Sequence, residues 1–223
     1  MSCIVAAHNE APRIARVLSV LLSFKGFDEV IVVDDGSTDD TAGVAQRLGA
    51  RVLRLGKNAG KGRAMDTGVR AARGNVLFFC DADVRGLSHR IICMILERVL
   101  SGDLDMVIGM RNRKVYFLRF IFFFIPLLGG ERALTRDLWE KISARYKDGF
   151  RIETALNYFS EHFGKGYDFK VFPGLTQTIK EKKLGLVKGF MARVQMYGEV
   201  TEAWWELHVP VLSEGDERDT SPA

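Results

Sequence analysis

Two carboxylates follow an apolar run of the kind found in buried β-strands. The stretch LFFCDADV, residues 77–84, leads directly into Asp81 and Asp83, with only Ala82 between them. An unpaired carboxylate inside a protein is costly, so this pair must lie at a solvated strand end or hold something positive. Mg²⁺ and Mn²⁺ prefer oxygen ligands and often link carboxylates to a substrate diphosphate. Asp81 and Asp83 are therefore candidate metal ligands, although Asp-x-Asp also occurs in ordinary loops.

A second acidic pair, Asp34 and Asp35, closes another run of β-branched residues just before Gly36. One interpretation is that these acids precede a helix, where the helix dipole favours negative charge. That interpretation explains Asp39 and Asp40 better than it explains two consecutive acids at a strand end. In the alternative, a carboxylate accepts hydrogen bonds from a base edge or a ribose hydroxyl.

A basic glycine-rich segment, NAGKGRA, covers residues 58–64, with Lys61 between Gly60 and Gly62 and followed by Arg63. Glycines let a backbone approach a ligand closely, and amides and cations can face phosphate oxygens. The spacing of a P-loop is absent, and no G-x-G-x-x-G follows the first strand, which argues against a dinucleotide-binding dehydrogenase. A flexible turn with solvated charges is the alternative interpretation.

Strands that alternate with helices must position these residues, and this alternation predicts a mostly parallel α/β sheet flanked by helices. In such sheets, ligands bind at the carboxyl ends of the strands, where HNE (8–10), DDGS (34–37) and DAD (81–83) are all expected. After about residue 110 the alternation fades, and only one more strand, near KVFPG, is expected. The expected strands cover about 2–7, 29–37, 51–55, 75–83 and 105–110, and the expected helices about 11–24, 37–50 and 87–102. Residues 58–74 are expected to form a glycine-rich loop that leads into a further helix.

Length and composition fit one globular domain. The chain has 223 residues, 47% of them apolar, and a formal charge of +4. Such a mild positive charge is too small for a dedicated nucleic-acid binder but is compatible with phosphate ligands or an anionic membrane surface. The three cysteines fit no metal motif and are expected to be free thiols in a reducing compartment. The chain opens on an apparent strand rather than a leader, so we expect a cytoplasmic protein.

Two segments combine basic and apolar residues and raise the question of membrane contact. Residues 115–128 form a Phe-rich run beside Arg111, Arg113 and Lys114, too short to span a bilayer. Residues 180–205 alternate basic and apolar side chains. Both segments can lie in a membrane interface, or the first can be a buried helix and the second an ordinary amphipathic helix. The tail, 213–223, is polar and expected to be disordered.

The blocks VAAHNE, VIVVDDGSTDDT, NAGKGRAMDTGV and FFCDAD, in this order and spacing, resemble the family 2 glycosyltransferases. GGERAL (129–134), GFRIETAL (149–156) and GLTQTIKEKKLGL (174–186) look like bacterial members related to glucosyl-3-phosphoglycerate synthases and polyprenyl-phosphate sugar transferases. The resemblance implies a Rossmann-like A-type glycosyltransferase fold. It also implies a single domain over 1–212, with a nucleotide-sugar-binding half at 1–110 and an acceptor half at 111–212.

The resemblance also implies roles for individual residues. Mg²⁺ or Mn²⁺ would be held by Asp81 and Asp83, with Asp83 the firmer ligand and Gln177 at a position where relatives carry a histidine ligand. Glu153 would act as a base near the acceptor, unless it is simply a solvated acid on a helix. The nucleotide would be bound by Ala7, His8, Glu10, Asp34, Asp35, Gly60, Lys61 and Gly62, and the donor sugar by Arg63, Glu131 and Arg132.

The implied activity is metal-dependent transfer of a sugar from a nucleotide-diphospho-sugar to an acceptor. A polyprenyl phosphate acceptor would already be nucleophilic and need no base, and it would place the protein at the cytoplasmic membrane face. A small soluble hydroxyl compound would need a base such as Glu153. The alternatives are a nucleotidyltransferase, disfavoured because HNEAPR replaces the usual glycine-rich segment, and a non-catalytic sugar-nucleotide-binding protein.

Overall fold

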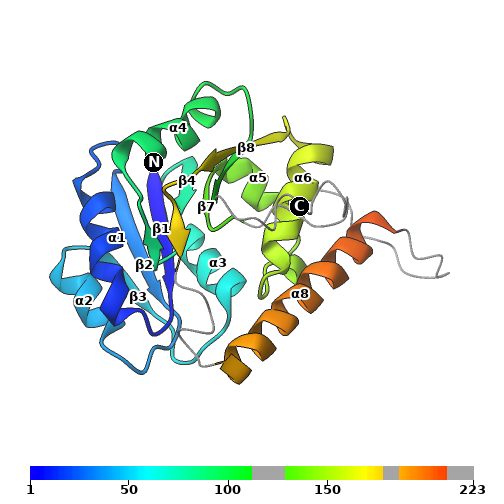
Figure 1. The fold of residues 1–223 in the computed structure, drawn as a ribbon. Helices are drawn as coiled ribbons and strands as arrows, with labels where there is room; N and C mark the ends of the chain where they lie inside the picture. Colours follow the sequence, from blue (N-terminus) through cyan, green and yellow to red (C-terminus); the bar gives the residue numbers. More distant parts are fainter. Residues whose placement is uncertain (112–128, 178–185, 210–223) are drawn as a thin grey trace.

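The computed structural model describes residues 1–111, 129–177 and 186–209 (Figure 1). The strands in this part of the chain are β1 (Ser2–Ala7), β2 (Glu29–Asp34), β3 (Arg51–Arg54), β4 (Val76–Phe79), β5 (Val84–Arg85), β6 (Met106–Arg111), β7 (Glu131–Thr135), β8 (Tyr167–Phe172) and β9 (Thr176–Gln177). The helices are α1 (Ala11–Ser23), α2 (Thr41–Arg47), α3 (Lys61–Ala71), α4 (His89–Leu100), α5 (Arg136–Glu140), α6 (Arg151–Phe163) and α8 (Leu186–His208), with a 3₁₀ turn at Ala144–Tyr146.

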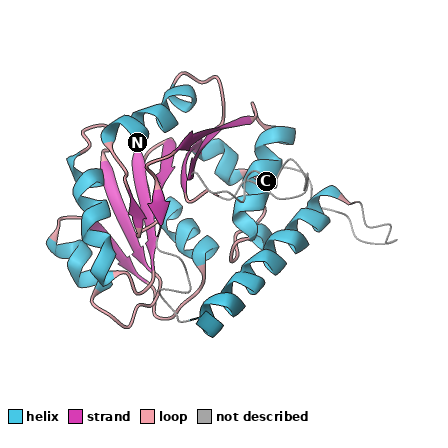
Figure 2. Cartoon of the chain, in the orientation of Figure 1, coloured by secondary structure: helices cyan, strands magenta, loops and turns pink. Residues whose placement is uncertain are grey.

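Seven strands form the central sheet in the order β3-β2-β1-β4-β7-β6-β8, and β5 and β9 form a separate two-stranded sheet. Figure 2 shows the strands in magenta with helices in cyan around them. All neighbouring pairs in the large sheet are parallel except those of β7, which runs antiparallel to both β4 and β6. The predicted mostly parallel α/β architecture is therefore confirmed.

Strand β7 was not expected, because its sequence ERALT begins with two charged residues. Both side chains are nevertheless buried, with Glu131 0% and Arg132 1% exposed. A rule that assigns buried strands from apolar runs cannot recognise a strand whose buried positions are filled by ion-paired side chains. The expected strand near KVFPG is present as β8.

The central strands place three polar loops at one edge of the sheet. Strands β2, β1 and β4 are adjacent and parallel, with Ala7 opposite Asp34 and Ile4 opposite Phe79. Their carboxyl ends lead into the loops at 8–10, 35–40 and 80–83. The convergence of these loops, predicted from the sequence, is confirmed, and the shared edge is called the rim from here on.

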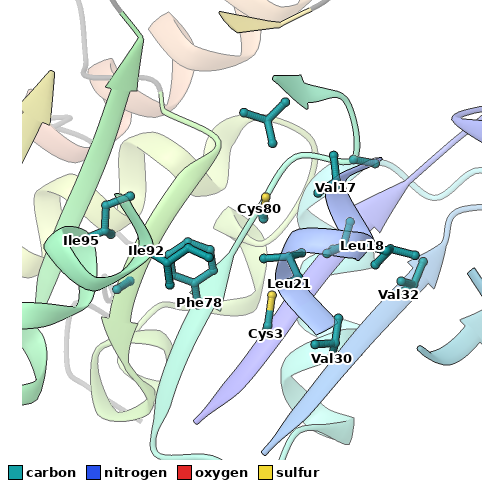
Figure 3. Packing of buried hydrophobic residues seen from close by; sticks show 14 of the residues in the cluster. Cys3, Val17, Leu18, Leu21, Val30, Val32, Phe78, Cys80, Ile92 and Ile95 are labelled. Atoms are coloured by element: carbon teal, nitrogen blue, oxygen red, sulfur yellow. The ribbon is translucent and has the colours of Figure 1, made fainter. Parts of the chain in front are cut away.

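Two layers of helices cover the sheet. One apolar cluster packs α1, α2 and α4 on one face, and Figure 3 shows Phe78 and Cys3 of the sheet, with Cys80 just after β4, beside Leu21 and other residues of this layer. The second cluster packs α3, α5 and α6 on the opposite face. Since both faces are covered, the central strands are buried along most of their length, as their β-branched sequences indicated.

Helix α2 begins later than expected. The helix was expected from residue 37, but it starts at Thr41. Ser37 and Thr38 instead hydrogen-bond to Asn9 of the neighbouring loop. Asp39 and Asp40 therefore precede the helix. The helix ends at Arg47, short of the expected end at residue 50, and Gly49 follows it with a φ of 92°.

Helix α8 packs against α6 through Val200 and Ala203 and the ion pairs of Arg151 with Glu202 and Glu206. No helix in the described ranges is long and apolar enough to cross a membrane. The Phe-rich run at 115–128, with Arg113 and Lys114 before it, lies outside the described residues, as do residues 180–185 and the tail at 213–223.

Candidate functional site

The first aspartate after β4 is held between two cations from distant parts of the chain. The ammonium of Lys61, in the first turn of α3, lies 3.2 Å from Asp81 Oδ1. The guanidinium of Arg111, the last residue of β6, donates to Asp81 Oδ2 at 2.7 Å. Gly130 permits this approach, because a Cβ atom there would lie 1.9 Å from Asp81 Oδ2. The predicted rim position of Asp81 beside the Lys61 turn is thus observed.

The second aspartate is buried beside Gln177. Val84 directly follows Asp83 and pairs with Gln177 in the antiparallel β5–β9 ribbon. The Gln177 side-chain amide donates to Asp83 Oδ1 at 3.0 Å and also lies 3.5 Å from Asp81 Oδ2. Gln177 therefore reaches both aspartates, as its predicted place near the metal site requires, but it presents its nitrogen rather than its oxygen to them.

Arg111 connects these groups, and the sequence did not single it out as a site residue. Its guanidinium donates to both oxygens of Glu131, at 2.7 and 2.9 Å, and to Oε1 of Gln177. Its partners lie 20, 30 and 66 residues away in the sequence. Nothing local marks such a residue, although a lone arginine closing an apolar strand, VIGMR, is an unusual pattern that could have drawn attention to it.

Glu153 lies in the first turn of α6 and is buried, which excludes the interpretation as a solvated surface acid. Its Oε1 accepts a hydrogen bond of 2.6 Å from Lys61, and its Oε2 lies 3.5 Å from the guanidinium of Arg132. Arg132 also donates to the carbonyl oxygen of Gly129 at 2.9 Å. Glu153 thus has a cation at each carboxylate oxygen.

These contacts form one charged cluster of three cations and four acids. Its members are Lys61, Asp81, Asp83, Arg111, Glu131, Arg132 and Glu153. The formal charge of the cluster is therefore −1. Buried charges are tolerated only when they are paired in this way.

Burial and ion pairing act in opposite directions on the ionisation of the cluster. Burial alone would raise the pKa of Asp81, but the charges of Lys61 and Arg111 outweigh it and hold that pKa well below its usual range. Burial alone would lower the pKa of Lys61, yet Asp81 and Glu153 keep it above the ordinary lysine value. For Glu131, burial dominates and raises the pKa, and Arg111 opposes the rise. Asp81 and Lys61 are therefore charged at neutral pH.

The donor set fits a divalent cation that shares its coordination with a substrate. Asp81 and Asp83 supply hard carboxylate oxygens at a strand end. Among the described residues, no group of three or more His, Cys, Asp and Glu side chains could hold a metal by itself. A site of this kind suits Mg²⁺ or Mn²⁺ bound jointly by one or two carboxylates and phosphate oxygens, and does not suit a closed structural zinc site.

The loop after β1 is tied to the loop after β2. The ring nitrogen Nδ1 of His8 lies 2.8 Å from the carbonyl oxygen of Asp35, and Asn9, with a φ of 55°, accepts from the Thr38 amide at 2.8 Å. The His8 ring is exposed at the rim, whereas Ala7 and Glu10 are buried. His8 therefore has a side chain open to a ligand, whereas the predicted nucleotide-binding residues Ala7 and Glu10 do not.

Asp35 is buried and holds the glycine-rich segment in place. One carboxylate oxygen accepts from the Ala59 amide at 2.7 Å and the other from the Gly60 amide at 3.0 Å. Asp34 likewise accepts from the Ser37 amide at 3.1 Å. Both acids lie at the rim as predicted, and in this structure their carboxylates fix the loops that surround it.

Gly60 and Gly62 have different structural reasons for being glycine. Gly60 precedes α3 with a φ of 92°, a conformation that favours glycine. Gly62 is packed against a neighbouring segment, where its amide donates to the Gly149 carbonyl at 3.0 Å and an added Cβ would lie 2.7 Å from the Lys147 carbonyl oxygen. Lys61, between the two, is the residue of this turn whose side chain enters the cluster.

The structure does not bring Arg63 to the charged cluster. Residues two apart on a helix project in nearly opposite directions, so Arg63 projects away from Lys61. Its exposed guanidinium pairs with Asp148 at 3.1 Å. Together with Asp66, Arg70, Arg145 and Lys147, it lines a separate cavity of about 480 Å³. The predicted contact of Arg63 with a donor sugar has no support in this arrangement.

Comparison with known proteins adds to this geometry. The family model described as Glycosyl transferase family 2 matches residues 2–172. The chain is similar to the dodecaprenyl-phosphate galacturonate synthase of Rhizobium johnstonii, at 34% identity over 51% of this chain and 37% of the relative. It is 35% identical to glycosyltransferase AglD of Haloferax volcanii over 94% of this chain and 38% of the relative.

A third relative is the dolichyl-phosphate beta-glucosyltransferase of Drosophila melanogaster, which is 43% identical over 37% of this chain and 30% of the relative. The chain spans less than two fifths of the length of these curated relatives.

Among solved structures, the chain resembles glucosyl-3-phosphoglycerate synthase from Mycobacterium tuberculosis in complex with Mn²⁺, UDP-glucose and phosphoglyceric acid. The TM-score is 0.73 at 22% identity, over 91% of this chain and 79% of the other. At this identity the likeness concerns the fold, which is the A-type glycosyltransferase fold expected from the sequence.

Proposed function

Because the chain belongs to glycosyl transferase family 2, we propose that it moves a sugar from a nucleotide-diphospho-sugar to an acceptor at the rim. The observation that carries the proposal is the meeting of Asp81, Asp83 and Lys61 beside the loops that follow β1 and β2. The two carboxylates and the ammonium therefore lie at the carboxyl ends of parallel strands, which is where such sheets bind their ligands.

The leaving group of such a transfer is a nucleoside diphosphate, whose charge must be stabilised. Asp81 and Asp83 would hold Mg²⁺ or Mn²⁺, which neutralises negative charge on the diphosphate when bound. The ammonium of Lys61, fixed by Asp81 and Glu153, would face the same phosphate oxygens. A preorganised cation stabilises developing charge without further reorganisation, which is how this chain would accelerate the departure of the diphosphate.

The nucleoside would lie over the loops that follow β1 and β2. We place the exposed His8 ring against the base, with the backbone of Ala7 and Glu10 shaping the loop. Asp34 and Asp35, which fix the surrounding loops, would approach the base and ribose from below. In this arrangement residues 1–110 bind the nucleotide-sugar, whereas the second half of the domain receives the acceptor.

Glu131 and Arg132, two buried members of the cluster, would act on the donor sugar indirectly. Glu131 holds Arg111, and Arg132 supports Glu153, so both set the positions of side chains nearer the rim.

We further propose that the acceptor is a polyprenyl phosphate. A general base must reach the acceptor hydroxyl with a carboxylate oxygen, but the two oxygens of Glu153 are occupied by contacts with Lys61 and Arg132. A phosphate oxygen is already nucleophilic and needs no base. Two of the relatives are named for polyprenyl-phosphate acceptors, dodecaprenyl phosphate and dolichyl phosphate, which agrees with this choice.

Such an acceptor lies in a membrane, and one face of α8 suits contact with a lipid surface. Met191, Val194, Tyr197 and Trp205 lie on one side of the helix, and between 44% and 66% of each is exposed. Ala203, which is fully buried against the domain, lies on the opposite side of the helix. Tyrosine and tryptophan favour the membrane interface because each combines an apolar ring with a polar group. We therefore propose peripheral contact through α8.

The proposal is tested by incubating the purified protein with Mn²⁺ and a panel of UDP, GDP, ADP and dTDP sugars, with dodecaprenyl phosphate as acceptor. We expect one donor to yield a lipid-extractable sugar and the matching nucleoside diphosphate. Transfer to phosphoglyceric acid in place of the lipid would reject the lipid acceptor but keep the activity. Release of inorganic diphosphate from a nucleoside triphosphate and a sugar phosphate would instead indicate a nucleotidyltransferase.

A further inference from the structure

The side-chain amide of Gln177 is oriented by its neighbours. Its oxygen accepts from the Arg111 guanidinium, and its nitrogen donates to Asp83 at 3.0 Å. The backbone fixes its place, because Gln177 pairs with Val84, the residue after Asp83.

Only one orientation of this amide satisfies its surroundings. A guanidinium can only donate hydrogen bonds, and an ionised carboxylate can only accept them. Rotation of the amide by half a turn would place its NH₂ group against Arg111 and its oxygen against Asp83, so both hydrogen bonds would become repulsive contacts. Arg111 cannot readily move away, because it is buried and pairs with Glu131 and Asp81.

We propose that Gln177 donates hydrogen bonds to Asp81 and Asp83 and does not bind the metal. In this proposal, Arg111 fixes the orientation of the Gln177 side-chain amide. Both are positioning residues in this proposal, which rests on the proposed function. The amide fixes the two carboxylates in one direction, and Arg111 fixes the amide.

A consequence follows for metal binding. Because the Gln177 amide oxygen faces Arg111, it is turned away from the expected metal position. Among the described residues beside Gln177, Asp81 and Asp83 are then the candidate metal ligands. A cation held by two carboxylates depends on further oxygens from the diphosphate. We therefore expect Mn²⁺ alone to bind weakly and a nucleoside diphosphate to tighten its binding.

The test is a direct titration of Mn²⁺ into the full chain, with free Mn²⁺ followed by electron paramagnetic resonance, in the absence and presence of UDP, GDP, ADP or dTDP. The variants are Gln177→Ala and Gln177→His. Asp83→Asn is the control, because it removes a carboxylate that is proposed to bind the metal. Thermal melts establish that each variant is folded.

If Gln177 is a donor, Gln177→Ala weakens Mn²⁺ binding less than Asp83→Asn does, because both carboxylates remain and Asp81 retains Lys61 and Arg111. Gln177→His adds an imidazole ligand and tightens binding by at least about tenfold. Asp83→Asn weakens it by at least about tenfold. The proposal is overturned if Gln177→Ala weakens binding as much as Asp83→Asn while Gln177→His matches the wild type.

Such a result would show that Gln177 is a metal ligand, and it would leave the proposed sugar transfer intact. A wild-type protein that binds no Mn²⁺ with any of the four nucleotides would reject the metal site itself, and the role of Gln177 with it.

Discussion

The ammonium of Lys61 lies 2.6 Å from Oε1 of Glu153, and this contact joins the first turn of α3 to the first turn of α6. The two residues are 92 positions apart in the sequence. Through this pair, the half of the domain expected to bind the nucleotide is linked to the half expected to receive the acceptor. Glu153 therefore sets the position of the cation that would face the diphosphate.

Replacing Glu153 distinguishes a positioning role from a role as base. We expect Glu153→Gln to reduce kcat/KM by about tenfold, because Lys61 loses one charged partner, and to leave the pH dependence of kcat unchanged in shape. Loss of a general base would cost about 10²- to 10⁴-fold and remove the acidic limb of the profile. Initial rates of sugar transfer between pH 5.5 and 9 provide the measurement. Glu161→Gln, exposed on the same helix, is the control.

The pairing of Asp81 predicts how stability changes in acid. Lys61 and Arg111 hold the pKa of Asp81 below its unfolded value, which is about 3.9, despite the opposing effect of burial. A depressed pKa contributes stability above the unfolded value, and this contribution is lost as the pH falls below it. We expect the free energy of unfolding of the wild type to fall more steeply between pH 4.5 and 2.5 than that of Asp81→Asn.

Urea titrations in EDTA at several pH values measure this difference. Equal slopes for the two proteins would show that Asp81 is not held by its two cations in solution.

The close packing at Gly62 predicts a large effect of a single methyl group. In Gly62→Ala, the new Cβ would lie 2.7 Å from the Lys147 carbonyl oxygen, a backbone atom that cannot easily move. We expect a loss of about 1–3 kcal/mol in the free energy of unfolding, from overpacking. Gly56→Ala is the control, because no heavy atom lies within 4 Å of its added Cβ. A Gly62→Ala protein as stable as this control would contradict the observed packing.

The apolar face of α8 predicts binding to lipid. Trp205→Glu places a charge at a position that is 59% exposed in the wild type. We expect it to reduce co-sedimentation with vesicles of phosphatidylcholine and phosphatidylglycerol by at least about fivefold, because a charge opposes insertion into the interface. Gln46→Glu, an exposed position on α2, adds the same charge elsewhere and should bind like the wild type. Equal binding by all three proteins would remove α8 from the proposed membrane contact.

The sequence predicted the rim well because its residues follow regular strands. Apolar runs ending in Asp34 and in Asp81 mark two parallel strands, and the parallel arrangement brings their ends together whatever the details of the loops. The lysine between two glycines was assigned to the nucleotide site through the family resemblance, which rests on local sequence blocks. These features depend on local patterns, which a single sequence reveals.

The partners within the cluster could not be predicted in this way. Glu131 and Arg132 were expected to contact a sugar, yet both are buried in a strand that the pattern of charges concealed. Arg111 was assigned only to a basic segment, because its partners come from three other parts of the chain. Which charge neutralises which depends on how the two halves of the domain pack, and no local rule supplies that information.

If Asp81 and Asp83 bind a cation that in turn binds a diphosphate, the affinity for the nucleotide must depend on that cation, and calorimetric titration of nucleoside diphosphates measures this dependence. We expect one of UDP, GDP, ADP and dTDP to bind the wild type in Mn²⁺, EDTA to weaken this binding by at least about tenfold, and Asp83→Asn to weaken it equally while remaining folded. Binding of the same nucleotide with equal affinity in EDTA, or by Asp83→Asn, would rule out this cation site.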